Sequence, residues 1–185
     1  MFTKILPGMV DDAVEFFKDD LGKVKYIHQG KVNCISEFPY WLSKILTEHI
    51  EVNPEIKKHL EFFHPESEIK QLHQFINCRF GGLDYRGDII DGKLQESEYV
   101  HCPLRGNCKS EGILCKMPVV NGHTLTPTEI KIIQMSTTDM TNDVIAEEAG
   151  LALGTFHKIK QNIYDKCCVP TKQCLTKLAY SLNLI

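Results

Sequence analysis

The sequence predicts a mainly α-helical protein with an N-terminal helical module that includes a small β-hairpin, a cysteine-rich segment and a C-terminal unit of four helices. Three observations predict this fold class. Apolar residues recur every three or four positions through most of residues 1–77 and again through residues 123–185. Between these stretches, residues 78–118 are rich in glycine and contain four cysteines. A chain of 185 residues can form one domain or two small ones.

Residues 1–77 are predicted to fold into helices and one hairpin. Apolar side chains spaced three or four positions apart over residues 10–21 predict a first short helix, which Gly22 would end. Residues 23–35 alternate apolar and polar side chains and predict the β-hairpin. Three further helices, two of them with a proline near the first turn, are predicted over residues 39–50, 53–63 and 64–77.

Capping residues define the helices of the C-terminal unit. Thr126 and Glu129 form the pattern of a capping box around Pro127, in which each side chain bonds the backbone amide of the other residue. Thr141 is placed to cap a second helix, and Gly150 is placed to end it. A third helix and then a fourth, which begins at Pro170, complete the unit. A linker over residues 118–123 precedes the first of the four helices and connects the unit to the rest of the chain.

The third of these helices, over residues 154–166, is predicted to be amphipathic. Its apolar stripe runs from Phe156 to Cys167 with helical spacing. The opposite face carries hydrogen-bonding side chains: His157, Lys158, Gln161 and Asp165, flanked by Thr155 and Asn162. A helix, a glycine turn and a second helix with such a face are typical of a helix-turn-helix, whose second helix fits the major groove of B-DNA. The alternative is an ordinary four-helix unit with a solvated polar face.

The segments LTPTEIKIIQ, TNDVIAEEAGL and GTFHKIKQNIYDKCCV resemble the LuxR/GerE-type DNA-binding domain. The pattern of that family is approximately LTxxE, then S/T-N-x-x-I-A, then G-T-V-x5-N-I-x-x-K-x-x-V. The resemblance covers residues 123–185, a third of the chain, without an internal gap between Thr141 and Val169. The matching positions are Leu125, Thr126, Glu129, Thr141, Asn142, Ile145, Ala146, Leu151, Gly154, Thr155, Asn162, Ile163, Lys166 and Val169.

The resemblance implies a transcriptional regulator that binds double-stranded DNA through a recognition helix over residues 154–166. It implies that the residues nearest to the bases are Thr155, His157, Lys158 and Gln161, and that those near phosphates are Asn162, Lys166 and Lys172. The fourth helix, over residues 170–182, would form a homodimer, and RNA polymerase is a further candidate partner. Three features depart from the family: Ala152 stands where a capping serine is usual, Ile159 stands where a histidine is common, and no arginine follows Arg105 to read guanine.

The charge distribution is compatible with this interpretation. The whole chain has a net charge of −3, which alone argues against general nucleic-acid binding. Residues 154–185, however, contain five lysines and one aspartate, and five minus one gives +4. Binding to phosphates requires a basic face and not a basic protein.

Four cysteines in the middle segment predict a metal site. They form the pattern C-x23-C-x5-C-x6-C and are Cys78, Cys102, Cys108 and Cys115. Thiolates that converge on Zn²⁺ would supply folding free energy to a glycine-rich segment, and four sulfurs also suit a [4Fe–4S] cluster. The pattern lacks the C-x-x-C pair that is usual for structural zinc, so four unligated thiols are a third reading. We predict zinc, with the [4Fe–4S] cluster as the alternative cofactor.

Several classes of protein are disfavoured by the sequence. No apolar run approaches the roughly 18 residues of a membrane span, and Asp11 and Asp12 interrupt any signal-peptide core, so we expect a cytoplasmic protein without membrane contact. No nucleophile motif or nucleotide-binding loop is present, so we do not expect an enzyme. The alternatives to a simple DNA-binding regulator are an Fe–S redox-sensing regulator and a protein-interaction adaptor that acts on the transcription machinery.

Overall fold

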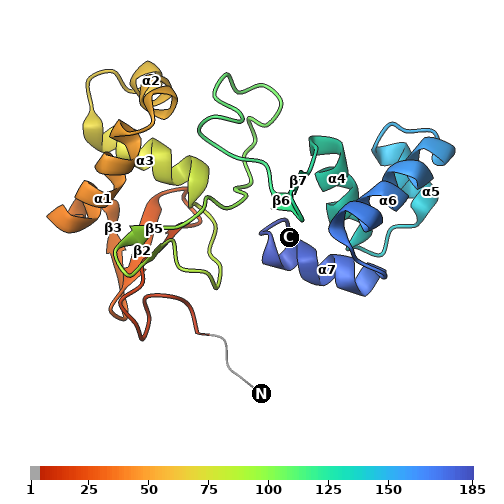
Figure 1. Cartoon of the computed structure of the whole chain (residues 1–185), viewed down its shortest axis with the longest axis horizontal. Coiled ribbons are helices and arrows are strands. Elements are labelled where there is room, and N and C mark those ends of the chain that lie inside the picture. The colour runs from red at the N-terminus through yellow and green to blue at the C-terminus, as the bar shows by residue number, and fades with distance from the viewer. Residues whose placement is uncertain (1–4) are drawn as a thin grey trace. The chain divides into compact units, whose positions relative to one another are not determined.

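The structure of the protein is a computed structural model, which describes residues 5–185. The chain divides into two compact units, Met1–Lys116 (unit 1) and Met117–Ile185 (unit 2). The chain as a whole is mainly α-helical with small antiparallel sheets, as the sequence predicts (Figure 1). Within the described part of the chain, no helix is both long enough and apolar enough to cross a membrane.

Unit 1 begins with a three-stranded antiparallel sheet. Its strands, in spatial order, are β1 (Glu15–Lys18), β2 (Val24–His28) and β3 (Lys31–Cys34). The hairpin predicted over residues 23–35 is confirmed by β2 and β3. Its two-residue turn, Gln29 and Gly30, has positive φ at both positions, which is the geometry that matches the twist of a hairpin.

The helix predicted over residues 10–21 is wrong, because this stretch contains β1. Val14 and Phe16 are completely buried on one face, which is the alternation of a strand. Leu21, which the helical spacing placed inside, is exposed. The alternation is hidden in the sequence because Glu15, the residue between the two apolar side chains, is also completely buried.

Three helices pack with the sheet to form the core of unit 1 (Figure 1). After a short 3-10 helix, η1 (Ile35–Glu37), they are α1 (Tyr40–Glu51), α2 (Pro54–Phe63) and α3 (Glu68–Arg79). All three match predicted helices. Pro54 lies in the first turn of α2, and the Ser67 hydroxyl accepts a hydrogen bond from the Lys70 amide to cap α3. Large side chains that are almost fully buried fill the core: Phe16, Leu42, Leu46, Leu60, Phe75 and Phe80.

The rest of unit 1 contains little regular structure, as predicted. Two short strands, β4 (Ile89–Ile90) and β5 (Lys93–Leu94), form a ladder of two residue pairs. Val14 forms a β-bridge with Ile89, which attaches this ladder beside β1. The chain from residue 95 to residue 116 then has no helix or strand.

Unit 2 contains a hairpin and four helices. They are β6 (Val119–Val120), β7 (His123–Thr124), α4 (Pro127–Ser136), α5 (Asn142–Glu148), α6 (Leu153–Cys167) and α7 (Lys172–Ser181). The stretch predicted as a linker over residues 118–123 forms most of this hairpin. α4 packs against each of the other three helices. The buried side chains of the unit include Leu125, Ile130, Ile133, Ile145, Phe156, Ile163 and Leu175.

Backbone and side-chain caps fix the ends of these helices. The capping box of α4 is present: the Glu129 amide donates to the Thr126 hydroxyl at 3.2 Å, and the Thr126 amide donates to the Glu129 carboxylate at 2.7 Å. α5 ends in a Schellman turn, in which Gly150 has φ 67° and the Leu151 amide donates to the Ala146 carbonyl at 2.8 Å. This turn sets the direction in which α6 leaves α5.

α6 begins without a side-chain cap. Ala152 is its N-cap residue, with an extended backbone (φ −63°, ψ 141°) that suits a capping serine. We expect Ala152→Ser to raise the free energy of unfolding of unit 2 by about 1 kcal/mol, because its hydroxyl would accept an amide hydrogen bond from the first turn. Thermal denaturation followed by circular dichroism measures this change relative to the wild type. A serine variant no more stable than the wild type would contradict it.

Candidate functional site

α6 has one buried side and one exposed side. Phe156 and Ile163 are completely buried within unit 2, and Cys167 is nearly so. At about 100° of rotation per residue, the polar residues of the opposite side cover a continuous arc of about 160°. All of them are exposed, and we call five of them the α6 face: Thr155, His157, Lys158, Gln161 and Asn162. The exposed acidic side chain of Asp165 lies on the same side of the helix.

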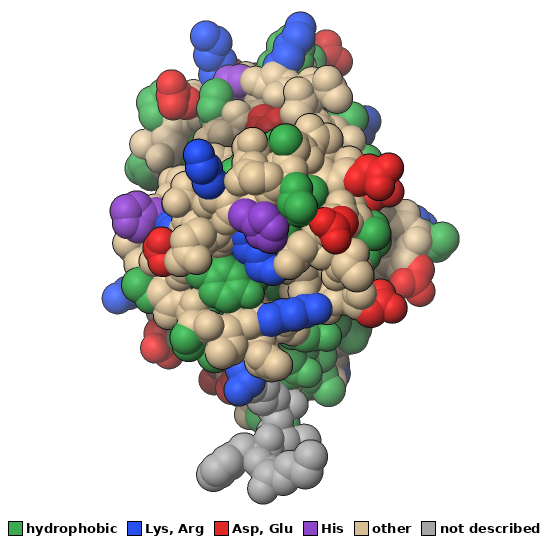
Figure 2. Space-filling model, turned by 90° about the vertical axis from the view of Figure 1, so that its right-hand side faces the viewer, with side chains coloured by type: hydrophobic (Ala, Val, Ile, Leu, Met, Phe, Trp, Pro, Cys, Tyr) green, Lys and Arg blue, Asp and Glu red, His purple; other side chains and the backbone are tan. Residues whose placement is uncertain are grey.

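The α6 face presents donors and acceptors from a single well-packed helix. Figure 2 views unit 2 from the side of α5 and α6, where lysine and histidine side chains occupy the middle of the surface and acidic side chains gather toward one edge. On this side of the helix, the Gln161 amide donates to the Asp165 carboxylate at 2.9 Å, one helical turn away. The predicted base-contacting residues therefore lie together on one side of the helix.

Lys166, predicted to lie near a phosphate, forms an ion pair within unit 2. Its ammonium group lies 2.7 Å from Glu129 Oε1 and 3.3 Å from the Thr124 carbonyl oxygen. Burial alone would raise the pKa of Glu129, but the hydrogen bonds from Lys166 and Thr126 outweigh it and hold the pKa below its usual value. Lys166 therefore joins α6 to the start of α4.

Two other lysines lie beside the α6 face. Lys172 is exposed, and its ammonium group donates to the Thr138 carbonyl at 2.7 Å, which leaves further donors of this group directed to solvent. Lys160, which sequence reasoning did not select, donates to the Asn142 side chain at 2.7 Å and joins α6 to α5. Burial and the charge of Lys172 lower the pKa of Lys160. The only sequence signal for this contact is the Thr-Asn pair at the start of α5.

The four cysteines predicted as metal ligands lie in one region of unit 1. Cys78 is on α3 and the others are on the irregular segment, and all four are half-buried free thiols. Burial raises the pKa of the Cys78 thiol, and the charges of Cys115, Cys102 and Cys108 raise it further, so these three cysteines lie within electrostatic range of Cys78. Among the described residues, no three His, Cys, Asp or Glu side chains are already spaced as metal ligands.

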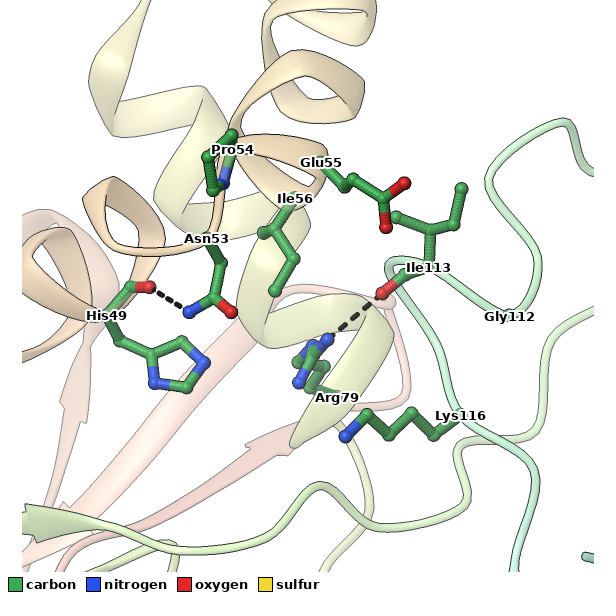
Figure 3. Close-up of a pocket in the computed structure, with 9 residues that line it drawn as sticks. All are labelled: His49, Asn53, Pro54, Glu55, Ile56, Arg79, Gly112, Ile113 and Lys116. Atoms are coloured by element: carbon green, nitrogen blue, oxygen red, sulfur yellow. Dashed lines mark hydrogen bonds between the residues drawn. The ribbon is translucent and has the colours of Figure 1, made fainter.

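A pocket of about 360 Å³ lies beside this region, between α1, α2, α3 and the irregular segment (Figure 3). Arg79 and Lys116, each directly following a cysteine, line it together with His49 and Asn53. Figure 3 shows the Lys116 side chain extending toward Arg79. Burial lowers the pKa of His49, and the charges of Arg79 and Lys116 lower it further. Glu55 also lines the pocket, so Arg79 and Lys116 together give this recess next to the thiols an excess of one positive charge.

A group of carboxyl side chains is buried beside β1, and sequence reasoning missed it. Glu15 accepts a hydrogen bond from the Asp84 amide, and Asp88 accepts one from the Phe16 amide, both at 2.7 Å. Burial raises the pKa of Glu15 to about 9, and the charges of Asp84 and Glu98 add to this effect. Burial also raises the pKa of Asp88 well above its usual value. Glu15 therefore holds a proton near neutral pH, and burial beside it favours the protonated form of Asp88 as well.

Comparisons with known proteins give no family assignment. No protein-family model matches the sequence, and no curated protein or solved structure is significantly similar to it. The candidate functions therefore depend on the residues and geometry of the two units.

Proposed function

We propose that the protein is a DNA-binding transcriptional regulator and that unit 2 inserts α6 into the major groove of double-stranded DNA. The observation that carries this proposal is the α6 face, because five exposed hydrogen-bonding side chains lie on one side of a helix whose other side is buried. A helix of 15 residues is about 22 Å long, and the major groove, about 12 Å wide, admits an α-helix.

The contact between α5 and α6 supports the same proposal. In a helix-turn-helix, the first helix crosses the DNA backbone while the second enters the groove, so the two must hold a fixed angle. Here the Schellman turn at Gly150 and the hydrogen bond from Lys160 to Asn142 hold α6 against α5. The resemblance of residues 123–185 to the LuxR/GerE-type domain is an independent reason to place α5 and α6 in these roles.

Each side chain of the α6 face has a chemical partner in DNA. Gln161 can bind adenine through its amide oxygen and nitrogen, and Lys158 can donate to the O6 and N7 acceptors of guanine. Thr155 and His157 lie near the start of α6, from which recognition helices reach base edges. Asn162 is placed to bind a phosphate oxygen, which fixes the position of the helix without reading sequence.

We further propose that the protein acts as a homodimer through α7. Leu175 and Ala179 are buried, on the side of α7 that packs against α4. Tyr180 and Ile185, in contrast, are 66% and 43% exposed, and together they offer apolar area to a second copy. A two-fold dimer would present two α6 helices to half-sites about one turn of DNA apart.

Lys158→Ala should weaken binding to every DNA duplex, because it removes a positive charge from the α6 face. We expect an affinity loss of roughly fivefold to tenfold at moderate salt, which corresponds to about 1–1.4 kcal/mol. If Lys158 contacts a phosphate as it approaches the bases, the slope of log affinity against log salt should fall in magnitude by about 1. Fluorescence anisotropy titrations of a labelled duplex at several salt concentrations measure both quantities.

Lys44→Ala is the matched control, because Lys44 is an exposed lysine on α1 of unit 1. It removes the same charge and should leave the affinity unchanged. Equal losses of DNA affinity in the two variants would mean that binding depends on the net charge of the protein and not on the α6 face. A wild-type protein that binds no duplex but binds RNA polymerase would favour the adaptor function instead.

A further inference from the structure

The chain between Gln95 and Lys116 follows a defined path although it buries few apolar side chains. It has no helix or strand, and its largest buried apolar side chains are Tyr99, Val100 and Leu114. Three of the four clustered cysteines lie in this stretch, and the fourth is in the last turn of α3. A covalent or coordinate cross-link at the cysteines would explain why such a segment keeps one conformation.

Tight turns place two of these cysteines. The Arg105 amide donates to the Cys102 carbonyl at 3.2 Å, and the Glu111 amide donates to the Cys108 carbonyl at 3.1 Å, so each cysteine opens a four-residue turn. The two turns are joined by Glu111, whose carboxylate accepts a hydrogen bond from the Gly106 amide at 2.7 Å. Glu111 also forms a β-bridge with Cys115. One residue therefore connects the surroundings of three cysteines.

Arg79 attaches the fourth cysteine to this arrangement. It follows Cys78 in α3, and its guanidinium group donates to the carbonyls of Ile113 and Leu114 at 3.0 and 3.1 Å. These two residues directly precede Cys115, so α3 and the last cysteine are held side by side. The Gln74 amide also donates to the Cys78 sulfur at 3.1 Å, as hydrogen bonds to metal-bound thiolates do.

Positively charged side chains lie next to the thiols. Arg79 is only 5% exposed, and among the described residues no carboxylate forms an ion pair with it. Lys109 and Lys116 likewise directly follow cysteines. A buried guanidinium is costly without a counter-charge. Four neutral thiols supply none, whereas four thiolates around one Zn²⁺ carry a formal charge of −2.

We propose that Cys78, Cys102, Cys108 and Cys115 bind one Zn²⁺ as a structural tetrathiolate site that fastens the segment 95–116 to α3. Binding would draw the sulfurs to about 2.3 Å from the metal, and the four protons would leave with solvent. Arg79 and Lys116 would balance the negative charge of the site. This proposal does not rest on DNA binding, because it concerns unit 1 and the α6 face belongs to unit 2.

The test is the metal content of the full chain, purified without chelator and without oxygen. We expect about one zinc per chain by elemental analysis and no visible colour. Replacing zinc with Co²⁺ should give the strong visible absorption bands of tetrahedral cobalt–thiolate coordination. Iron with sulfide and absorption near 400 nm would overturn the zinc assignment in favour of a cluster. Protein that contains no metal and gives no cobalt bands after refolding with Co²⁺ would overturn the site itself.

Thiol reactivity tests the four ligands without any variant that must fold. A thiol reagent should modify the exposed Cys34 and Cys168 more readily than the four ligands, and a chelator should make the four ligands react as well. Cys108→Ser should lower the zinc content at least fivefold, whereas Cys174→Ser, a half-buried cysteine of unit 2, should leave it unchanged. Ligand thiols that react as readily as Cys34 and Cys168 before any chelator is added, or equal zinc in both variants, would contradict the assignment.

Discussion

Unit 1 should lose stability progressively as the pH rises from about 5 to about 9, because two buried carboxyl groups bind protons more tightly in the folded state than in the unfolded chain. The folded pKa of Glu15 is raised to about 9, above its ordinary value of 4.5, and that of Asp88 is raised as well. A carboxyl whose pKa is higher in the folded state contributes its stabilisation fully below the unfolded pKa. That stabilisation is lost as the pH approaches the folded pKa.

The expected effect is large. Over this range, each carboxyl that stays protonated in the folded state and ionises in the unfolded state lowers the free energy of unfolding by up to about 1.4 kcal/mol per pH unit. Glu15→Gln, which resembles the protonated side chain in shape, should flatten the dependence. It should also make unit 1 more stable than the wild type above pH 8.

Urea denaturation at pH 5 to 9, followed by tryptophan fluorescence, measures this prediction. Trp41 is the sole tryptophan of the sequence and lies on α1, so its emission reports on unit 1 alone. Glu66→Gln, at an exposed position, is the control and should follow the wild-type curve. A Glu15→Gln curve that runs parallel to the wild type across the whole range would contradict the buried proton.

Lys166→Met should destabilise unit 2 by about 2–3 kcal/mol. The Glu129 side chain is 9% exposed and its partner Lys166 is 23% exposed. Removing the lysine would leave a nearly buried carboxylate and the Thr124 carbonyl without their charged donor. Hydrogen exchange of the α4 and α6 amides measures the loss within unit 2.

Lys158→Met is the matched control, because it removes the same charge from an exposed position and should change stability by less than about 0.5 kcal/mol. The two variants should behave in the opposite way toward DNA. At a temperature where both are folded, Lys166→Met should keep the wild-type salt slope, whereas Lys158→Met should reduce it. A smaller salt slope for Lys166→Met would contradict this prediction and would mean that Lys166 contacts a phosphate, as the family resemblance implies.

Much of unit 2 could be predicted because its signals are local. The capping box at Thr126, the glycine after α5 and the stripe that includes Phe156 and Ile163 each depend on residues within about four positions of one another. The exposed α6 face follows directly from that stripe. The ion pair between Lys166 and Glu129 could not be predicted, because it joins residues 37 positions apart.

Unit 1 was predicted less well because its signals are not local. The apolar spacing predicts a helix where β1 lies, because the polar residue Glu15 is buried between Val14 and Phe16 and hides the alternation of a strand. The burial of Glu15 depends on contacts with residues far along the chain, Asp84 and Asp88, which the sequence does not reveal. The cysteine spacing indicated a metal site. The charge balance around that site depends on Arg79, whose contacts with the segment 95–116 only the fold reveals.

The most direct test of the central proposal is an amide NMR titration of the full chain with a duplex selected from a randomised pool. We predict that the largest chemical-shift changes fall on residues 153–166 of α6 and on the start of α5, with unit 1 unaffected. Shifts confined to α7 or to unit 1, or no selected duplex at all, would contradict the proposal that the protein reads DNA through the α6 face.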